Sequence, residues 1–316
     1  MIHYTVQRLG LAAVIVLSVL VLMFVMMHLV PGDPASVLLG PRATPEMVED
    51  LHRRMGLDQP LHVQILRFLA SAASGDLGRD PMSGEAVAAA VLSQVPYTAA
   101  LAVAGLGWAI ALGVPLGCYS AVRRGTLADR ISGIVSVGAI AVPSFVVALY
   151  ALLIFCVALP WFPAIGAGAP GDILDQLWHL VLPAFAIGLG WVGYLARLVR
   201  ASMLEVLGEK HIRTARAFGL AERRIVYHYA LKLAVLPVVT VLGVGLGRLL
   251  SGAVFAEIVF SRPGVGRLVY DAVVTRNAPV VVGGVLVTTM IFVLCTLAAD
   301  LLNAALDPRV RDRLRQ

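Results

Sequence analysis

The stretch LGLAAVIVLSVLVLMFVMMHL (9–29) decides the fold class of this chain, because it carries no Asp, Glu, Lys or Arg. A helix needs about 20 mostly apolar residues to cross the hydrocarbon core of a membrane. Five later stretches have a similar length and apolar content, at 97–122, 131–159, 180–199, 233–255 and 280–302. The sequence therefore predicts an all-α integral membrane protein with six transmembrane helices.

The composition excludes most soluble classes of protein. Of the 316 residues, 59% are hydrophobic and 14% are charged, and the mean hydropathy is +0.87. A soluble domain has about 25% charged residues. A soluble enzyme, a disordered chain and a coiled coil are therefore excluded. The first apolar stretch exceeds the core of a signal peptide, and PGDPAS (31–36) after it lacks a small-residue cleavage pattern, so we expect a retained first helix.

The basic residues predict the orientation of the six helices. One set of alternate loops, together with both termini, holds 16 Lys and Arg, whereas the other set holds 8. Lys and Arg are enriched in cytoplasmic loops. We therefore expect both termini and the 200–232 loop to be cytoplasmic. The basic residues stand in short runs between apolar stretches, which indicates topology rather than a nucleic-acid surface.

Three regions follow from this topology. Residues 1–29 form the N-terminus and first transmembrane helix, and 97–316 form a five-helix core that contains the cytoplasmic loop 200–232. Residues 30–96 are expected to form a small extracytoplasmic cap. Within it, PEMVEDLHRRMGL (45–57) has a helical pattern, while PGDP (31–34) and GDLGRDP (75–81) carry turn signals.

The chain lacks the motifs of common membrane enzymes and primary pumps. Its only lysines, Lys210 and Lys232, do not stand in a Gly-Lys-Ser/Thr phosphate-binding loop. Neither HExxH nor GxSxG occurs, and Cys and His residues form no cluster with ligand spacing. The sequence predicts no catalytic residue, no metal site and no cofactor bound by this chain.

Small residues and two charged residues stand inside the apolar stretches. Gly113 with Gly117, and Gly243 with Gly247, have the spacing that lets helices approach closely in lipid. Ionisable groups inside a membrane are functional candidates by default, so Arg248 and Glu257 are candidate residues of a translocation path. For Arg248, a structural ion pair or a side chain extending to the membrane surface is an equal alternative. The two residues are nine positions apart and fall on nearly opposite helix faces, so no pair is assumed.

The most informative segment is EVLGEKHIRTARAFGLAERRIVYHYALKLAVLP (205–237). Its pattern predicts a short helix over HIRTARAF, a left-handed turn at Gly219, and a second helix that continues into the next span. A short helix with small residues suits docking against a partner. The alternative from residues alone is a basic loop that anchors helices at lipid headgroups.

This loop resembles the EAA loop of binding-protein-dependent ABC importer permeases, because RTARAFG (213–219) is followed by Leu-Pro at 236–237. Its long spacing is similar to the peptide and nickel branch, and the whole chain resembles the B-type permease subunit of dipeptide and oligopeptide transporters. The matching motifs run in order along the chain: PGDPA (31–35), MGLDQPLHVQ (55–64), GDLG (75–78), Pro96 and Thr98, GVPLG (113–117), RRGTLAD (123–129), VPSF (142–145), VLPAF (181–185), YLARLVRASMLEVL (194–207), GRLLSGAVFAEIVFSRPGVGRL (247–268) and LDPRVR (306–311). Phe218 departs from the family, which commonly carries Lys there, and RNAP (276–279) replaces RDYP.

The resemblance implies the type I ABC importer permease fold in a bacterial inner membrane. It implies a second, C-type permease subunit, two cytoplasmic ATPase subunits that bind ATP and Mg, and an extracytoplasmic substrate-binding protein. The chain itself would not be an enzyme. The coupling residues that the resemblance implies are Arg213, Thr214, Ala215, Arg216, Ala217, Gly219 and Leu220.

The implied cargo is a dipeptide or oligopeptide, and nickel, glutathione or haem are alternatives for the same machinery. A secondary carrier is a competing class, but such carriers usually place acids near the midplane of broken helices. A standalone channel is another, but it would not need a docking loop.

Overall fold

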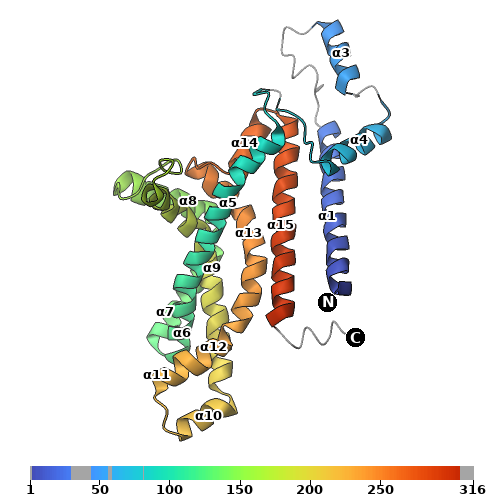
Figure 1. Cartoon of the computed structure of the whole chain (residues 1–316). Helices are drawn as coiled ribbons and strands as arrows, with labels where there is room; N and C mark the ends of the chain where they lie inside the picture. The colour runs from blue at the N-terminus through green and yellow to red at the C-terminus, as the bar shows by residue number, and fades with distance from the viewer. Residues whose placement is uncertain (1, 30–43, 56–58, 81, 307–316) are drawn as a thin grey trace. The chain divides into compact units, whose positions relative to one another are not determined.

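The computed structural model describes residues 2–29, 44–55, 59–80 and 82–306, and every regular element in these ranges is a helix. They divide into two units. Unit 1 holds Met1–Thr5, Val95–Arg267 and Ile291–Gln316, and unit 2 holds Val6–Gln94 and Leu268–Met290. The elements follow in chain order, with α for the α-helices, which Figure 1 labels, and η for π-helices. They are α1 Ile2–Leu29, α3 Pro45–Met55, α4 Leu61–Ala73, α5 Val87–Trp108, η1 Ala109–Gly113, α6 Val114–Val122, α7 Leu127–Ala141, α8 Ser144–Leu152, η2 Leu153–Ala158, α9 Ile173–Leu207, α10 Lys210–Ala217, α11 Glu222–Arg224, η3 Ile225–Ala230, α12 Leu231–Ala234, α13 Leu236–Val259, α14 Val265–Val274 and α15 Ala278–Leu306.

The predicted membrane helices are confirmed, with one change. The described residues contain five helices that are long and apolar enough to cross a membrane, and a sixth span if one bent pair is counted together. That pair is Leu127–Ala141 with Ser144–Ala158, bent by 98°. The span predicted over 131–159 is therefore present as this bent pair and not as one straight helix.

The break in the third span follows from Pro143. Proline has no N–H for a helical hydrogen bond and pushes the preceding residue out of the helical region. Val142 is accordingly extended, with φ −82° and ψ 123°, and Pro143 has φ −60° and ψ 142°. Pro115 and Pro237 interrupt nothing in this way, because each lies in the first turn of its helix.

Helix α9 is the longest helix in unit 1, and glycines on neighbouring helices let them approach it closely. It has 35 residues, about 52 Å at 1.5 Å per residue, and so exceeds the predicted 180–199 at both ends. A Cβ at Gly113 would lie 2.8 Å from the Val192 carbonyl oxygen, and one at Gly117 would lie 2.8 Å from Val199 Cβ. The predicted close packing at these glycines is confirmed.

The second glycine pair packs α13 against the end of α15 in the same way. A Cβ at Gly243 would overlap Ala299, and one at Gly247 would lie 2.6 Å from the Phe292 ring. The segment GVGLGR (243–248), which holds this glycine pair, is helical throughout.

Unit 2 contains the described part of the predicted cap up to Gln94. The helical pattern at 45–57 forms α3, which ends at Met55, whereas PGDP (31–34) lies outside the described residues. The 75–86 turn uses Gly75, Gly78 and Gly84 at positive φ. The assignment of 30–96 as an extracytoplasmic cap stays a prediction.

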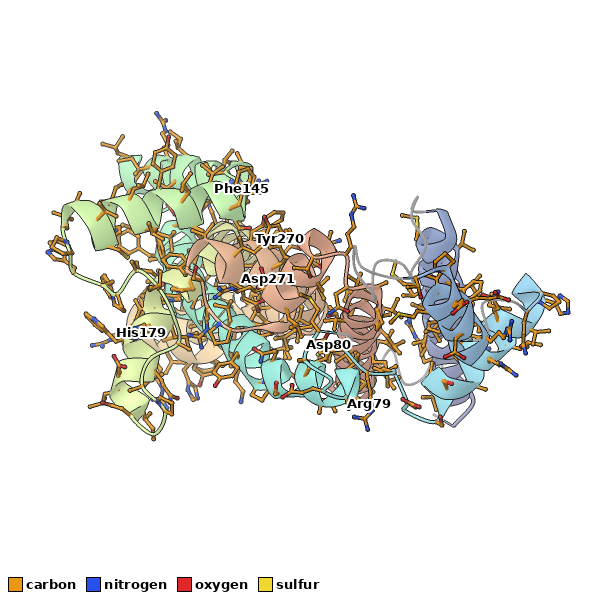
Figure 2. All side chains as sticks on the ribbon, turned by 90° about the horizontal axis from the view of Figure 1, so that it is seen from above. Arg79, Asp80, Phe145, His179, Tyr270 and Asp271 are labelled. Atoms are coloured by element: carbon orange, nitrogen blue, oxygen red, sulfur yellow. The ribbon has the colours of Figure 1, made fainter. Side chains whose placement is uncertain are left out.

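Asp80 joins this turn to the segment after α14 within unit 2. Its carboxylate accepts hydrogen bonds from the Met82 N–H at 2.8 Å and the Asn277 amide at 2.6 Å. Burial raises the pKa of Asp80, but these bonds and those from Ser83 outweigh it, so the pKa lies below its ordinary value. Asp80 belongs to the turn, and Tyr270 and Asp271 to α14 (Figure 2).

Candidate coupling site and translocation path

The predicted coupling helix is α10, and its end has the predicted turn. Gly219 has φ +74°, its N–H donates to the Arg216 carbonyl at 2.9 Å, and the Leu220 N–H donates to the Ala215 carbonyl at 3.2 Å. This pair of bonds is the Schellman motif, in which the residue after the cap takes the left-handed conformation. No atom of the described part of the chain lies within 4 Å of a Cβ built at Gly219, so only the backbone conformation demands glycine there.

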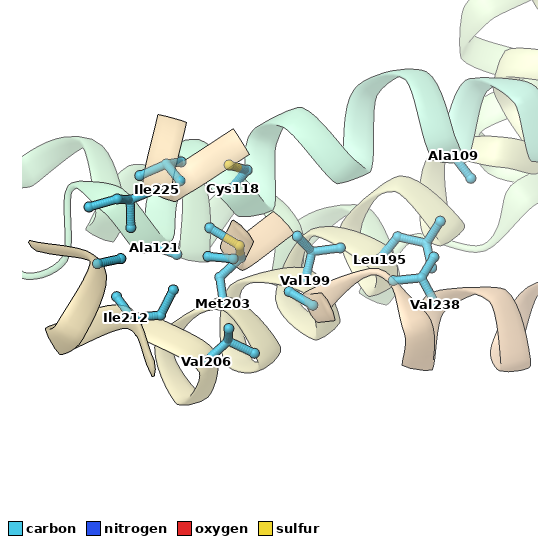
Figure 3. Close-up of a cluster of buried hydrophobic side chains, with 14 residues drawn as sticks. Ala109, Cys118, Ala121, Leu195, Val199, Met203, Val206, Ile212, Ile225 and Val238 are labelled. Carbon is cyan, nitrogen blue, oxygen red and sulfur yellow. The ribbon is translucent and has the colours of Figure 1, made fainter. Parts of the chain in front are cut away.

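One face of α10 packs into the chain's own core. Ile212 is fully buried and Ala215 is 9% exposed, and both join a cluster of buried residues that includes Met203 of α9 and Ile225 of η3. Figure 3 shows this cluster, to which α6 contributes Cys118. The cluster fixes α10 on the ends of α6 and α9. Ala215 therefore contacts this chain, and a partner would not touch it directly.

The other face of α10 is open. Arg213, Thr214, Arg216 and Ala217 are exposed, and Phe218 at the turn is 82% exposed. The sequence comparison singled out Phe218 only as a departure from the family. Its exposure could not be predicted from sequence, because it depends on the side of the turn to which the side chain points.

Arg216 is held in place on this face. Its Nη2 and Nε donate to the two carboxylate oxygens of Glu222, at 2.6 Å and 3.1 Å. This pair spans the Gly219 turn and links α10 to α11. Beside it lies an open groove of about 500 Å³ lined by Ala221, Arg223, Arg224 and Tyr227.

The two candidate path residues differ in their surroundings. Arg248 on α13 is exposed, and no hydrogen bond or ion pair joins it to another described residue. The described residues therefore do not show a structural ion pair for Arg248. Glu257, in the last turn of α13, is fully buried.

Glu257 caps the start of α14. Its Oε2 accepts a hydrogen bond from the Arg267 N–H at 3.0 Å, and its Oε1 accepts one from the Thr98 hydroxyl at 2.6 Å. The Gly266 N–H also donates to the Glu257 carboxylate. Thr98 Oγ1 in turn accepts the Val265 N–H at 2.9 Å. The first N–H groups of a helix have no intrahelical partner, and a carboxylate there is favoured by the helix dipole.

A second buried charge lies beside this cap. Arg262 is 3% exposed and interacts electrostatically with Glu257, and its Nε and Nη1 have no hydrogen-bond partner among the described residues. A Cβ at Gly264 would overlap the Glu257 carboxyl group. We refer to Thr98, Glu257, Arg262 and the backbone of 264–267 as the Glu257 cluster.

A separate polar cluster lies where α6, α7 and α9 meet. The Asp129 carboxylate accepts from Arg200 Nε and Nη2, at 2.6 Å and 2.8 Å, and from the Ser120 hydroxyl at 2.5 Å. Asp129 and Arg200 fall in RRGTLAD and YLARLVRASMLEVL, but nothing in either motif indicated that they pair. No group of three or more His, Cys, Asp or Glu that could hold a metal ion occurs among the residues that the structure describes.

Family comparison gives this geometry its context. The family described as "Binding-protein-dependent transport system inner membrane component" matches residues 113–312, and the corresponding N-terminal family matches 1–102. The chain belongs to this family. It is an ABC importer permease, a transport component rather than an enzyme.

Named relatives cover nearly all of the permease. It is 37% identical over 313 residues to the glutathione transport system permease protein GsiC of Escherichia coli (strain K12) and of Shigella flexneri serotype 5b (strain 8401). It is 36% identical over 311 residues to GsiC of Salmonella paratyphi A (strain ATCC 9150 / SARB42). Each match covers 98% of this chain and 99% of the relative. These relatives support the resemblance to the B-type permease of the peptide and nickel branch.

A solved structure supports the fold. The MetNI methionine ABC transporter, in an inward-facing conformation, matches with a TM-score of 0.56 at 20% identity, over 68% of this permease and 95% of that chain. The predicted type I ABC importer permease fold is thereby confirmed.

Proposed function

We propose that this permease forms one half of the translocation path of an importer for short peptides, and that the outward face of α10 couples it to the ATPases. Its partners would be a C-type permease, two cytoplasmic ATPase subunits that bind ATP and Mg, and an extracytoplasmic binding protein. Both termini and the 200–232 loop would be cytoplasmic, in a bacterial inner membrane. Residues 30–96 would form the cap that helps to receive the binding protein.

The observation that carries the proposal is the two-sided construction of α10. Its inner face is fixed by buried apolar contacts, while Arg213, Thr214, Arg216, Ala217 and Phe218 are left exposed around a rigid turn. Aromatic and Arg side chains dominate the binding energy of protein interfaces. Phe218 is the side chain we expect to anchor α10 in an ATPase cleft, and a displacement of that cleft would move α10 as a rigid body with α9.

Arg248 supports a cargo that carries a carboxylate. An exposed guanidinium on an otherwise apolar helix is expensive unless it faces a polar path, and guanidinium groups pair well with carboxylates. Short peptides and glutathione carry carboxylates, whereas a bare nickel ion would be repelled. The relatives' name makes glutathione the first cargo to test. Glu257 is buried, so we propose that it acts on the path only through α14.

The test uses the complete transporter, purified in mild detergent. Gly219→Val forces a β-branched side chain into the left-handed conformation, which costs about 1–2 kcal/mol. We expect it to lose ATPase subunits or to hydrolyse ATP without moving cargo. Gly171→Val is the matched control, because Gly171 has φ +90° with open space around it, in the loop we place outside the membrane. Equal ATPase retention and transport in both variants would contradict the proposed coupling role.

Orientation has its own test. Reporter fusions at Glu209 should report a cytoplasmic position, and fusions at Gly166 an extracytoplasmic one. The reverse pattern would overturn the topology and, with it, the docking of α10.

A further inference from the structure

The Asp129 carboxylate joins three helices at one point. Asp129 lies in the first turn of α7 and its side chain is 8% exposed. It accepts hydrogen bonds from Arg200 of α9, Ser120 of α6 and, at 2.9 Å, the Gly125 N–H of the turn between α6 and α7. With both Arg200 bonds counted, the four acceptor positions of the carboxylate are filled.

The geometry of this ion pair is more restrictive than apolar packing. Arg200 binds both carboxylate oxygens through Nε and Nη2, and such two-point bonds fix orientation as well as distance. The neighbouring buried cluster and the close contacts of Gly113 and Gly117 hold η1 and α6 against α9 through shape and apolar burial, which have no preferred bond direction. The ion pair adds a directional constraint on the position of α9 relative to α6 and α7.

Arg200 stands on the same continuous helix that leads to α10. Helix α9 runs without interruption from Arg200 to Leu207, and α10 begins at Lys210. A movement of α10 therefore reaches Arg200 through about two helical turns. Across the pair lie Ser120 of α6 and the helix α7. Helix α6 also meets α10 through the buried cluster, whereas the chain between α7 and α10 runs through α8 and α9, so the ion pair links α7 to the part of α9 nearest α10.

We propose that Asp129 and Arg200 are a positioning pair that transmits the displacement of α10 through α9 to α6 and α7, so that cargo movement stays tied to ATP hydrolysis. This inference rests on the proposed coupling function of α10. It assigns the pair a role in coupling and not in binding cargo, ATP or the ATPase subunits.

The experiment measures cargo uptake and ATP hydrolysis together, in liposomes that contain the complete transporter with its binding protein and glutathione or a dipeptide. The variant is Arg200→Gln, because the Arg200 side chain is 35% exposed and its loss leaves Asp129 bonded to Ser120 and Gly125. Arg197→Gln is the matched control, since Arg197 lies one turn earlier on α9 and is exposed. We expect Arg200→Gln to lower the uptake per ATP hydrolysed by about tenfold, and Arg197→Gln to leave it unchanged.

A double-mutant cycle separates coupling from a purely structural role. Asp129→Asn with Arg200→Gln should lower the uptake per ATP no further than either single change, because both remove one interaction. A structural role alone would reduce the amount of assembled complex and leave the ratio intact. If Arg200→Gln does not assemble, Arg200→Lys is used, because it keeps the charge and loses the two-point bond, and the ratio is again expected to fall.

An unchanged ratio in an assembled Arg200 variant would overturn the proposal. That result is distinct from failure of the proposed function, in which Gly219→Val would also transport at the unmodified rate with ATPases bound. An equal fall in the uptake per ATP hydrolysed in Arg197→Gln would likewise contradict a specific role for the pair.

Discussion

The loop around α10 exposes its charged side chains, whereas the Glu257 cluster buries them. At α10 the apolar residues, such as Ile212, turn inward, and Arg213 and Arg216 turn outward to solvent. At the Glu257 cluster the charged groups are buried, and the Glu257 carboxylate accepts hydrogen bonds from backbone N–H groups and from the Thr98 hydroxyl. The first region leaves side chains exposed for the partner contact that we propose. The second holds the joint between α13 and α14.

The difference teaches where function can be changed without unfolding the permease. Substitutions on the outer face of α10 should alter partner contacts at little cost in stability. Substitutions in the Glu257 cluster should alter stability first, because a buried charge would lose an opposing charge or a hydrogen-bond partner.

The largest effect is expected from Glu257→Leu. It removes the cap of α14 and leaves Arg262 buried without its opposing charge, at a cost of about 3–5 kcal/mol. The amount of folded permease in membranes and its thermal unfolding in detergent measure this. Glu257→Gln keeps one acceptor oxygen and should be less damaging. Folded yields of Glu257→Leu equal to the unmodified permease would show that the cluster stabilises nothing.

The next effect separates the two faces of α10. Ala215→Asp places a charge in the buried cluster with Ile212 and should destabilise the 200–232 loop by several kcal/mol. Ala217→Asp, two positions on, lies on the exposed face and should leave thermal unfolding unchanged while weakening the retention of ATPase subunits. Co-purification and thermal unfolding distinguish the two. The same behaviour from both variants would show that the two faces do not differ.

A smaller effect concerns Phe218 alone. Phe218→Ala removes an exposed side chain and should not change thermal unfolding, but it should weaken ATPase binding by about 2 kcal/mol, or roughly thirtyfold. A titration of purified ATPase subunits against the permease pair in detergent measures this. Tyr270→Ala, an exposed aromatic on α14, is the control and should bind ATPases normally. Normal binding by Phe218→Ala would remove Phe218 as an anchor.

The smallest effect compares the two helix ends. Helix α13 also ends in a Schellman turn, but Ser261 with φ +45° stands where α10 has Gly219. Ser261→Gly should raise the free energy of unfolding by up to about 1 kcal/mol, and Gly219→Ser should lower it by a similar amount. Shifts of the same sign in thermal unfolding would contradict the comparison.

The fold could be predicted largely from apolar length, since spans follow from about 20 apolar residues each. The turn at Gly219 could also be predicted, because only the local sequence decides it. The size of the bend at Pro143 could not be predicted, since proline in membrane helices can either kink a helix or end it. The Asp129–Arg200 pair and the Glu257 cap could not be predicted, because each joins residues far apart in the sequence whose contact depends on tertiary packing.

The central claim is that the outer face of α10 contacts an ATPase subunit. A photoreactive phenylalanine analogue at position 218 of the complete transporter tests it directly, with the same analogue at position 270 as control. We predict an adduct with an ATPase subunit from position 218 and none from position 270. An adduct at 218 with lipid alone, or an ATPase adduct from both positions, would contradict the claim.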